Sequence, residues 1–281
     1  MTGKELYLTL RNSQNLPNAF NDWKNYRQII TDFIIKHSEP DKSVAILGAG
    51  KCNDIDLLRL KDHFYTISLF DRDEKSMQEA LTKYHLTNSS CVEIHTTDFI
   101  GITDEMYCDY ADYMINELKA YRNNSNIKEL SRKIVEKLDE IFKKIENYNP
   151  QLGIQQYDYI ACFGVHSQLL NIPIWLWSIG LSNINQTDQT VEDRIKLENT
   201  KLVKKLNDEI ILLARKGIFL GCEMQRAGMS SAIEGALQAI EDIQNRNNHS
   251  IKLDNIEMTT WPFNPSQNII FQIGMMNIAI K

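Results

Sequence analysis

The sequence predicts an α/β fold, in which a doubly wound, mostly parallel seven-stranded sheet ends in a C-terminal antiparallel hairpin and carries a helical cap and a helical insertion. Two observations support this prediction. Short apolar, β-branched runs alternate with longer helical patterns, as expected for a sheet with helices on both faces. The last two strands are joined only by residues 261–266, which is too short for a crossover helix, so these strands should pair antiparallel.

Seven runs are predicted as strands. The five that precede the hairpin are nearly continuous in their apolar character, which is typical of strands covered on both faces. They span residues 43–47, 65–70, 91–95, 157–163 and 217–222, and the hairpin strands span residues 256–260 and 269–278.

Helical patterns fill the segments between these strands, at residues 53–61, 74–84, 105–148, 167–181, 191–215 and 230–245. The long segment 105–148 is expected to hold more than one helix. Before the first strand, apolar residues from Trp23 to Phe33 recur at helical spacing. We therefore expect an N-terminal helical cap over residues 1–40 and a main domain over residues 41–281, with a helical insertion at 104–148.

Composition narrows the classes of function. The chain has 281 residues, is 43% hydrophobic and carries a formal net charge of −6, so a sizeable core is expected and a nucleic-acid partner is not. The five cysteines are odd in number and lack C-x-x-C spacing, which argues against a disulfide framework or a zinc site, and no metal is expected. Without a signal core or a membrane-length apolar stretch, the sequence predicts a cytoplasmic protein that binds no membrane. A homo-oligomer is left open.

A glycine motif follows the first strand, as Gly48-Ala49-Gly50. Gly48 would permit a tight turn, and Gly50 would let the backbone approach a ligand closely. The helix expected next would present free N–H groups at its first turn. On its own, such a motif is also compatible with a purely structural turn.

Asp71 makes the glycine motif more informative. It follows the second strand, 21 residues after Gly50 (71 − 50), where an acidic side chain can accept hydrogen bonds from both hydroxyls of a ribose. Together the two features predict an adenosine-containing ligand. Asn53 occupies the position where a dinucleotide fingerprint has its third glycine, which counts against NAD.

Over residues 40–281 the sequence resembles the class I S-adenosylmethionine-dependent methyltransferases, which have a Rossmann-like fold. Besides the glycine motif and Asp71, the likeness rests on Thr97-Asp98-Phe99 after the third strand and on Asp158 near the start of the fourth. The loop Phe163-Gly164-Val165-His166 after the fourth strand and the antiparallel ending of the sheet complete it.

The resemblance implies S-adenosyl-L-methionine as the cofactor and assigns a contact to each matching residue. Gly48, Ala49 and Gly50 would lie against its methionine portion, and Phe163 and Gly164 would line the same end. Asp71 would hold the ribose. Arg72 would lie beside the adenine, and Asp98 would accept a hydrogen bond from the adenine amino group, with Phe99 as its apolar neighbour. The chain departs from the family pattern at Ile46, where many relatives are acidic, and at Cys52, where many have a third glycine. Asn53 and Asp54 follow and are candidates for the cofactor's amino group.

His166 is the candidate general base, because it follows the fourth strand at the ligand-binding edge of the sheet. A helix-capping, substrate-contacting or merely buried histidine is the alternative. Aromatic candidates for lining an acceptor pocket are Phe20, Trp23, Tyr26, Tyr107, Tyr110, Tyr113, Trp175 and Trp177, although each is also a common core residue, and Gln225, Arg226 and Met229 follow the fifth strand. Trp261 and Phe263 are expected to pack in the core.

The expected function is methyl transfer to a small-molecule or peptide-like acceptor by in-line displacement. The fourth strand is not followed by the N-P-P-Y/F motif of adenine-N6 and glutamine methylation, which argues against those acceptors. Three alternatives stay open: a non-catalytic S-adenosylmethionine-binding sensor or scaffold, an NAD-dependent oxidoreductase and an aminopropyl transferase of the same fold.

Overall fold

The structure of the protein is a computed structural model. The structure describes residues 2–13, 15–124, 126–153, 155–228, 233, 235–247 and 250–281, and of residues 122–124 the backbone alone. The described chain forms two compact units. One unit comprises residues 1–16, 100–149 and 168–202, and the other comprises residues 17–99, 150–167 and 203–281.

The second unit contains a seven-stranded sheet in the order β3-β2-β1-β4-β5-β7-β6. The strands span β1 Ser43–Leu47, β2 Thr66–Asp71, β3 Val92–Thr96, β4 Tyr157–Phe163, β5 Ala214–Arg226, β6 Ile251–Asn264 and β7 Ile269–Ile280. Strands β3, β2, β1, β4 and β5 pair in parallel, whereas β7 pairs antiparallel with both β5 and β6. The predicted fold class, a mostly parallel sheet with a C-terminal antiparallel hairpin, is confirmed.

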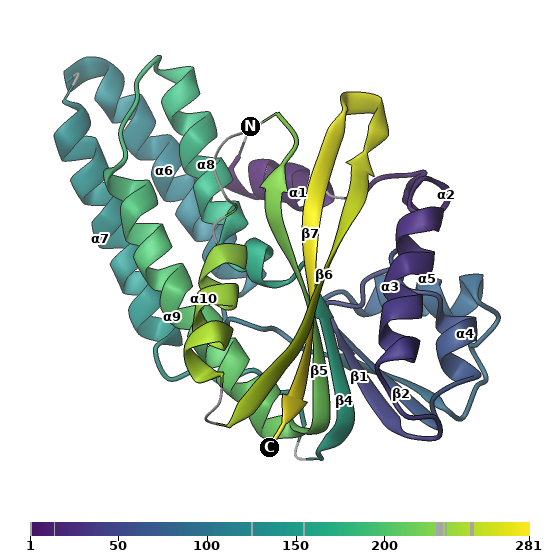
Figure 1. The fold of residues 1–281 in the computed structure, drawn as a ribbon. Helices are drawn as coiled ribbons and strands as arrows, with labels where there is room; N and C mark the ends of the chain where they lie inside the picture. Colours follow the sequence, from purple (N-terminus) through teal and green to yellow (C-terminus); the bar gives the residue numbers. More distant parts are fainter. Residues whose placement is uncertain are drawn as a thin grey trace. The chain divides into compact units, whose positions relative to one another are not determined.

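Burial explains why the central strands form. Val44, Ile46, Ile67 and Leu69 are buried, in keeping with a sheet covered on both faces. Figure 1 shows helices on both sides of it: α3 (Lys24–Lys36), α4 (Leu57–Lys61) and α5 (Glu74–Lys83) on one side and α10 (Ala236–Arg246) on the other. The short helix α2 (Ala19–Asp22) precedes α3. Four residues of the helix predicted at 230–245 (230–232 and 234) and Met229 before it lie outside the described part.

The first unit is helical. It contains α1 (Gly3–Ser13), α6 (Asp104–Asn124), α7 (Ile127–Ile145), α8 (Asn171–Asn183) and the first half of α9 (Thr190–Leu213), whose second half belongs to the sheet unit. Two helices therefore fill the segment predicted as 105–148. Tyr7 of α1 stacks on Tyr107 of α6, with 5.3 Å between ring centroids, and donates a hydrogen bond to Asp104. None of the described helices is both long enough and apolar enough to span a bilayer.

The predicted cap over residues 1–40 is divided between the two units. Residues 1–16 group with the insertion, while residues 17–40, with α3, group with the sheet. Trp23, Tyr26 and Phe33 explain the second assignment, since their rings contact Trp261 of β6 and Phe219 of β5. The N-terminal segment therefore contributes to both units, and α3 serves as a sheet-covering helix.

The helix expected at residues 53–61 begins only at Leu57. Residues 50–56 instead form an irregular segment, in which Gly50 and Cys52 have φ of +47° and +46°. Asp56 is the N-cap of α4, and its carboxylate accepts hydrogen bonds from the backbone N–H groups of Leu58 and Arg59. The expectation of free N–H groups directly after the glycine motif was therefore wrong.

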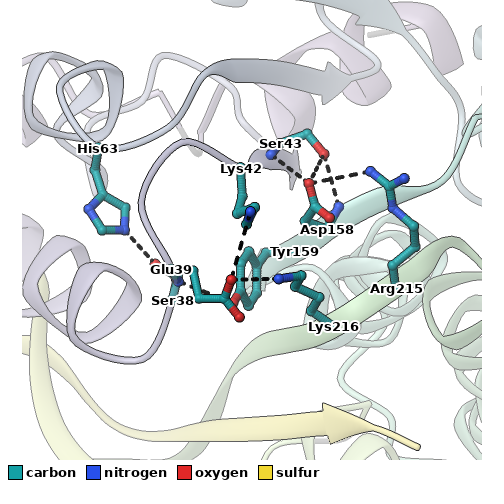
Figure 2. Close-up of polar contacts among 9 residues, drawn as sticks. All are labelled: Ser38, Glu39, Lys42, Ser43, His63, Asp158, Tyr159, Arg215 and Lys216. Carbon is teal, nitrogen blue, oxygen red and sulfur yellow. Dashed lines mark hydrogen bonds and ion pairs between the residues drawn. The ribbon is translucent and has the colours of Figure 1, made fainter.

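Asp158 links the N-terminal ends of three strands through hydrogen bonds and an ion pair (Figure 2). Its carboxylate accepts hydrogen bonds of 3.0 Å from both the backbone N–H and the hydroxyl of Ser43, and its own N–H donates to the Ser43 hydroxyl. Arg215 of β5 lies 3.3 Å away. Nearby, Glu39 pairs with Lys42 and Lys216. Asp158, which the family resemblance singled out, thus ties β1, β4 and β5 together at the end opposite the glycine motif.

Replacing Asp158 by alanine should lower the free energy of unfolding by about 1–2 kcal/mol at pH 7, through the lost charge-assisted hydrogen bonds. Burial acts to raise the pKa of Asp158, but the hydrogen bonds from Ser43 and the charges of Arg215 and Lys216 hold that pKa below its ordinary value. The stabilisation is therefore complete above the ordinary aspartate range, ~4, and disappears as pH falls through the lowered pKa. Urea denaturation of the wild-type protein and D158A at pH 7 and pH 3 measures this dependence. An equal loss of unfolding free energy in D158A at the two pH values would contradict it.

Candidate functional site

The glycine motif forms a tight turn at the carboxyl end of β1. The N–H groups of Gly48 and Ala49 both donate to the carbonyl of Phe70 on β2, at 2.8 and 3.0 Å. Gly48 has φ +72°, and a Cβ there would lie 2.5 Å from Val165 Cγ2. Only glycine satisfies both the left-handed conformation and the close approach of Val165.

Asp71, the last residue of β2, is joined directly to this turn. Its Oδ2 accepts a 2.8 Å hydrogen bond from the N–H of Gly50, and its Oδ1 accepts one of 2.8 Å from the N–H of Asp73. The N–H of Arg72 also interacts with this carboxylate, so only part of its four acceptor positions stays available to a ligand. Burial raises the pKa of Asp71, against the opposing effect of the backbone N–H groups of Asp73, Gly50 and Arg72.

Open space adjoins Gly50. Apart from the chain neighbours of Gly50, the described residues bring one atom within 4 Å of a Cβ built there, the Oδ2 of Asp71 at 3.8 Å. The missing side chain therefore leaves room beside a half-buried carboxylate with unused acceptor positions. These features suit a ligand that carries hydroxyl donors.

Residues 51–56 are held in place by side chains from distant parts of the sheet unit. Arg27 of α3 donates to the carbonyl of Asn53 at 2.8 Å, and Lys83 of α5 donates to the carbonyl of Lys51. The hydroxyl of Tyr84 donates to the carbonyls of Cys52 and Ile55. These bonds satisfy carbonyls that a helix would otherwise pair, which is why the segment stays irregular.

Asn53, predicted to contact the cofactor, uses its side chain within this segment, because its Oδ1 accepts a 2.8 Å hydrogen bond from Lys83. Asp54 follows it. Burial raises the pKa of Asp54 to about 6, against the opposing effects of its own N–H and of the Lys83 and Arg27 charges. Burial also lowers the pKa of Lys83 to about 8. The protonation state of Asp54 therefore depends on its burial and on the charges of Lys83 and Arg27.

Three more predicted contact residues come together after β2 and β3. Arg72 Nε lies 3.9 Å from Asp98 Oδ2, and both side chains are half-buried. Phe99, next to Asp98, is half-buried too. The chain approaches Asp71 here, since the N–H of Thr97 donates to the Asp71 carbonyl at 2.9 Å. Asp71, Arg72 and Asp98 therefore belong to one edge of the sheet.

The loop after β4 contains the remaining predicted contacts, Phe163 and Gly164. Phe163 is buried with its ring over Gly221, where a Cβ would lie 2.0 Å from it. Gly164 has φ +69° and donates to the carbonyl of Gly221 at 3.0 Å. A Cβ at Gly164 would lie 3.2 Å from Glu223 Oε1, so this glycine exposes its backbone to a carboxyl group on β5.

Glu223 was not predicted as a site residue. It is 3% exposed, and its Oε2 is a buried atom with no hydrogen-bond partner among the described residues. Burial raises the pKa of Glu223 to about 7, assisted by Asp54 and opposed by its own N–H and Ser167. The prediction ended the fifth strand at Cys222, whereas β5 continues to Arg226; a carboxylate directly after a buried strand was the available signal.

An aromatic cluster adjoins Glu223. Trp261 of β6 stacks on Tyr26 of α3 with 5.4 Å between ring centroids, and Trp23 and Phe263 contact it edge-on at 4.9 and 5.0 Å. Trp261 Cζ3 would lie 4.0 Å from a Cβ at Gly164. Trp261 and Phe263 therefore pack in this cluster, and Trp261 lies beside the loop after β4.

His166, the candidate base, is 1% exposed. Its Nε2 lies 2.9 Å from Asn207 Oδ1, and the Asn207 amide donates to Asp242 at 2.9 Å. Since that amide group faces Asp242, the Asn207 oxygen must accept the Nε2 proton of His166. Burial lowers the pKa of His166 to about 4. This geometry favours the buried, packing histidine among the alternatives, so His166 is not carried into the proposal below.

Of the described histidine, cysteine, aspartate and glutamate side chains, no three gather as a metal-binding group would require.

Gln225 and Arg226 end β5 opposite Gln272 and Phe271 of β7. Met229, the third residue suggested there, lies outside the described residues.

No protein-family model matches the sequence, and no curated protein matches it. Among solved structures the chain is similar to magnesium protoporphyrin IX methyltransferase from Synechocystis PCC 6803 with bound SAH, at 11% identity and a TM-score of 0.48 over 92% of this chain and 82% of that one. It is also similar to N-methyltransferase NodS from Bradyrhizobium japonicum WM9, with 8% identity, a TM-score of 0.46 and 92% and 86% coverage. A putative RNA methyltransferase from Pyrococcus horikoshii gives 7% identity, a TM-score of 0.43 and 90% and 81% coverage. At such values these similarities assign neither a ligand nor an activity.

Proposed function

We propose that the protein is an S-adenosyl-L-methionine-dependent methyltransferase that acts on a small-molecule or peptide-like acceptor. The observation that carries the proposal is the direct bond between the glycine turn and Asp71, beside the open space at Gly50. The acceptor capacity that this carboxylate keeps beside that space suits the hydroxyl groups of a ribose.

The residues around this carboxylate fit the rest of the cofactor. Arg72, Asp98 and Phe99 would hold the adenine, and Gly48–Gly50 with Gly164 would contact the methionine part. The cofactor would supply an activated methyl group on a sulfonium. The protein's contribution would be to hold the acceptor in line with that group, since orientation can supply much of the rate enhancement in such displacements.

The charge of the site favours a sulfonium over a dinucleotide. A Rossmann dinucleotide site places the pyrophosphate at a helix N-terminus directly after the glycine motif. Here Asp56 occupies the first N–H groups of α4, and Asp54 lies in the segment before it. Carboxylates would repel a pyrophosphate, whereas they attract the positive sulfonium and ammonium of S-adenosylmethionine. The inserted antiparallel β7 also departs from the 3-2-1-4-5-6 order of dinucleotide-binding sheets.

Calorimetric titration separates the two ligands. We expect S-adenosyl-L-methionine to bind saturably and at least about tenfold more tightly than NAD or NADH, a difference of about 1.4 kcal/mol. Tighter binding of either nicotinamide cofactor would contradict the proposal. Mass spectrometry of a metabolite extract incubated with the protein and isotopically methyl-labelled cofactor would then identify the acceptor. Binding without turnover in such extracts would favour the non-catalytic sensor or scaffold.

A further inference from the structure

Glu223 has a position that structural packing alone does not explain. Strand β4 ends at Phe163, which pairs with Gly221, and β5 continues past this point to Glu223 and beyond. Glu223 therefore lies at the carboxyl edge of the parallel strands, where ligands bind in open α/β sheets. Side chains two positions apart point to the same face of a strand, so Glu223 shares the face of Phe219, which contacts Phe33 of α3.

The surroundings of Glu223 are aromatic and negatively charged. Tyr26 of α3 and Asp54 both interact electrostatically with it, and Trp261 lies across Gly164 from it. Cys162 of β4 and Cys222 of β5 are the other titratable neighbours, and Ser167 donates a hydrogen bond to it. Within the described chain no lysine or arginine forms an ion pair with Glu223, and its Oε2 has no donor.

A buried carboxyl oxygen without a donor is costly unless a bound molecule supplies one. The charge around Glu223 defines the chemistry of that molecule. A second carboxylate, Asp54, interacts with Glu223 and adds negative potential. An ammonium group supplies the missing donor and is attracted by both carboxylates, whereas an anionic group is repelled by them.

We propose that Glu223 binds the ammonium group of an amine acceptor beside Gly164 and takes up its proton before methyl transfer. This inference rests on the proposed methyltransferase function and deepens it by naming the class of acceptor and the catalytic residue. The carboxylate of Glu223 accepts one proton from the ammonium, and the freed nitrogen lone pair forms the new bond to the methyl carbon. The electron pair of the broken carbon–sulfur bond stays on sulfur, and Glu223 then releases its proton to solvent.

The raised pKa of Glu223 suits this role. A carboxyl group with a pKa of about 7 takes a proton from an alkylammonium far more readily than one of ordinary pKa does. It is still largely ionised at slightly alkaline pH. Amine binding should therefore strengthen as pH rises through about 7, because the carboxylate forms, and weaken again when the amine loses its own proton, ~10.

Methylammonium is the probe for the test, because its small size makes binding independent of the rest of the acceptor. Its binding to the protein loaded with S-adenosylhomocysteine is followed by tryptophan fluorescence and calorimetry, with methanol as the neutral comparison. We expect saturable binding of methylammonium at pH 8 that is at least about tenfold weaker in E223Q, and no saturable binding of methanol. The matched control is E257Q, since Glu257 of β6 is already paired with Lys36 and should leave binding unchanged.

The outcomes separate this inference from the function on which it rests. If the wild-type protein fails to bind S-adenosylhomocysteine, the proposed function fails. If it binds S-adenosylhomocysteine but methylammonium binds no more weakly to E223Q than to wild type, or not at all, the inference on Glu223 is overturned and the function stands. A third outcome is that E223Q binds S-adenosylmethionine more weakly than wild type does, but binds S-adenosylhomocysteine and methylammonium equally well. Glu223 would then face the sulfonium, and the amine proposal would be overturned.

Discussion

Replacing Gly48 by alanine is expected to lower the free energy of unfolding by about 2–5 kcal/mol. Two costs combine at this position. The backbone has φ +72°, a conformation that costs a non-glycine residue about 1–2 kcal/mol, and the new Cβ would lie 2.5 Å from Val165 Cγ2. Relieving such a contact in a packed site typically costs a further ~1–3 kcal/mol. Urea denaturation of the wild-type protein and the variant measures the change. The dependence of the unfolding free energy on urea concentration should be the same for both proteins.

Gly228 provides the matched control for this substitution. It also has positive φ, +82°, but a Cβ there would meet no atom of the described residues within 4 Å. G228A should therefore show only the conformational cost, about 1–2 kcal/mol. If G48A and G228A destabilise equally, the contact with Val165 adds nothing, and the close packing of the turn against the loop after β4 is not what requires a glycine.

Replacing Asp71 by alanine should weaken binding of S-adenosyl-L-methionine by about 1–3 kcal/mol, roughly 5- to 150-fold. The variant loses the acceptors for the ribose hydroxyls and also leaves the N–H of Gly50 without its 2.8 Å partner. Because hydroxyl donors favour the ionised carboxylate, wild-type affinity should fall as pH drops through the raised pKa of Asp71. Calorimetry at several pH values tests both statements.

D158A is the control for Asp71, because Asp158 is a hydrogen-bonded carboxylate at the opposite end of the same sheet. It should reduce stability without changing cofactor affinity. Unchanged affinity in D71A would remove Asp71 from the binding site. An equal loss of affinity in both variants would mean that the effect of D71A arises from destabilisation of the sheet.

The sheet was predictable because its central strands are short, continuous apolar runs with distinct turns between them. β1 and β4 have the predicted bounds, and β2 and β3 differ by one residue at each end. The antiparallel ending followed from chain geometry alone, since residues 261–266 leave no room for a helix. The strands β5 and β6 extend beyond the predicted residues, because polar residues such as Glu223 and Lys252 interrupt their apolar pattern. β7 extends by two residues, Ala279 and Ile280.

The irregular segment after the glycine motif was not predictable from local sequence. The residues 53–61 read as a helix, but the carbonyls of Lys51 and Asn53 are taken by Lys83 and Arg27, about thirty residues away on either side. Such long-range donors decide between helix and loop only in the folded chain. The same holds for His166, whose partner Asn207 lies on α9, so a residue at the expected edge proved to be buried.

Part of the candidate site was accessible from spacing and part was not. Gly50 follows β1 and Asp71 ends the neighbouring parallel strand β2, so their meeting follows from the predicted topology, and their 2.8 Å hydrogen bond agrees with it. Identifying Glu223 as a site residue required knowing where β5 ends and which face of the strand Glu223 occupies. The sequence contains no local signal for the partner that its Oε2 lacks, because that property depends on burial by Tyr26, Trp261 and the loop after β4.

The central claim is that the glycine turn and Asp71 together hold the adenosine part of one ligand. A crystal structure of the protein with S-adenosylhomocysteine tests it most directly. The account predicts both ribose hydroxyls within hydrogen-bonding distance of the Asp71 carboxylate, with the ligand backbone passing over Gly50. A ligand bound elsewhere, or a ribose whose hydroxyls point away from Asp71, would contradict it.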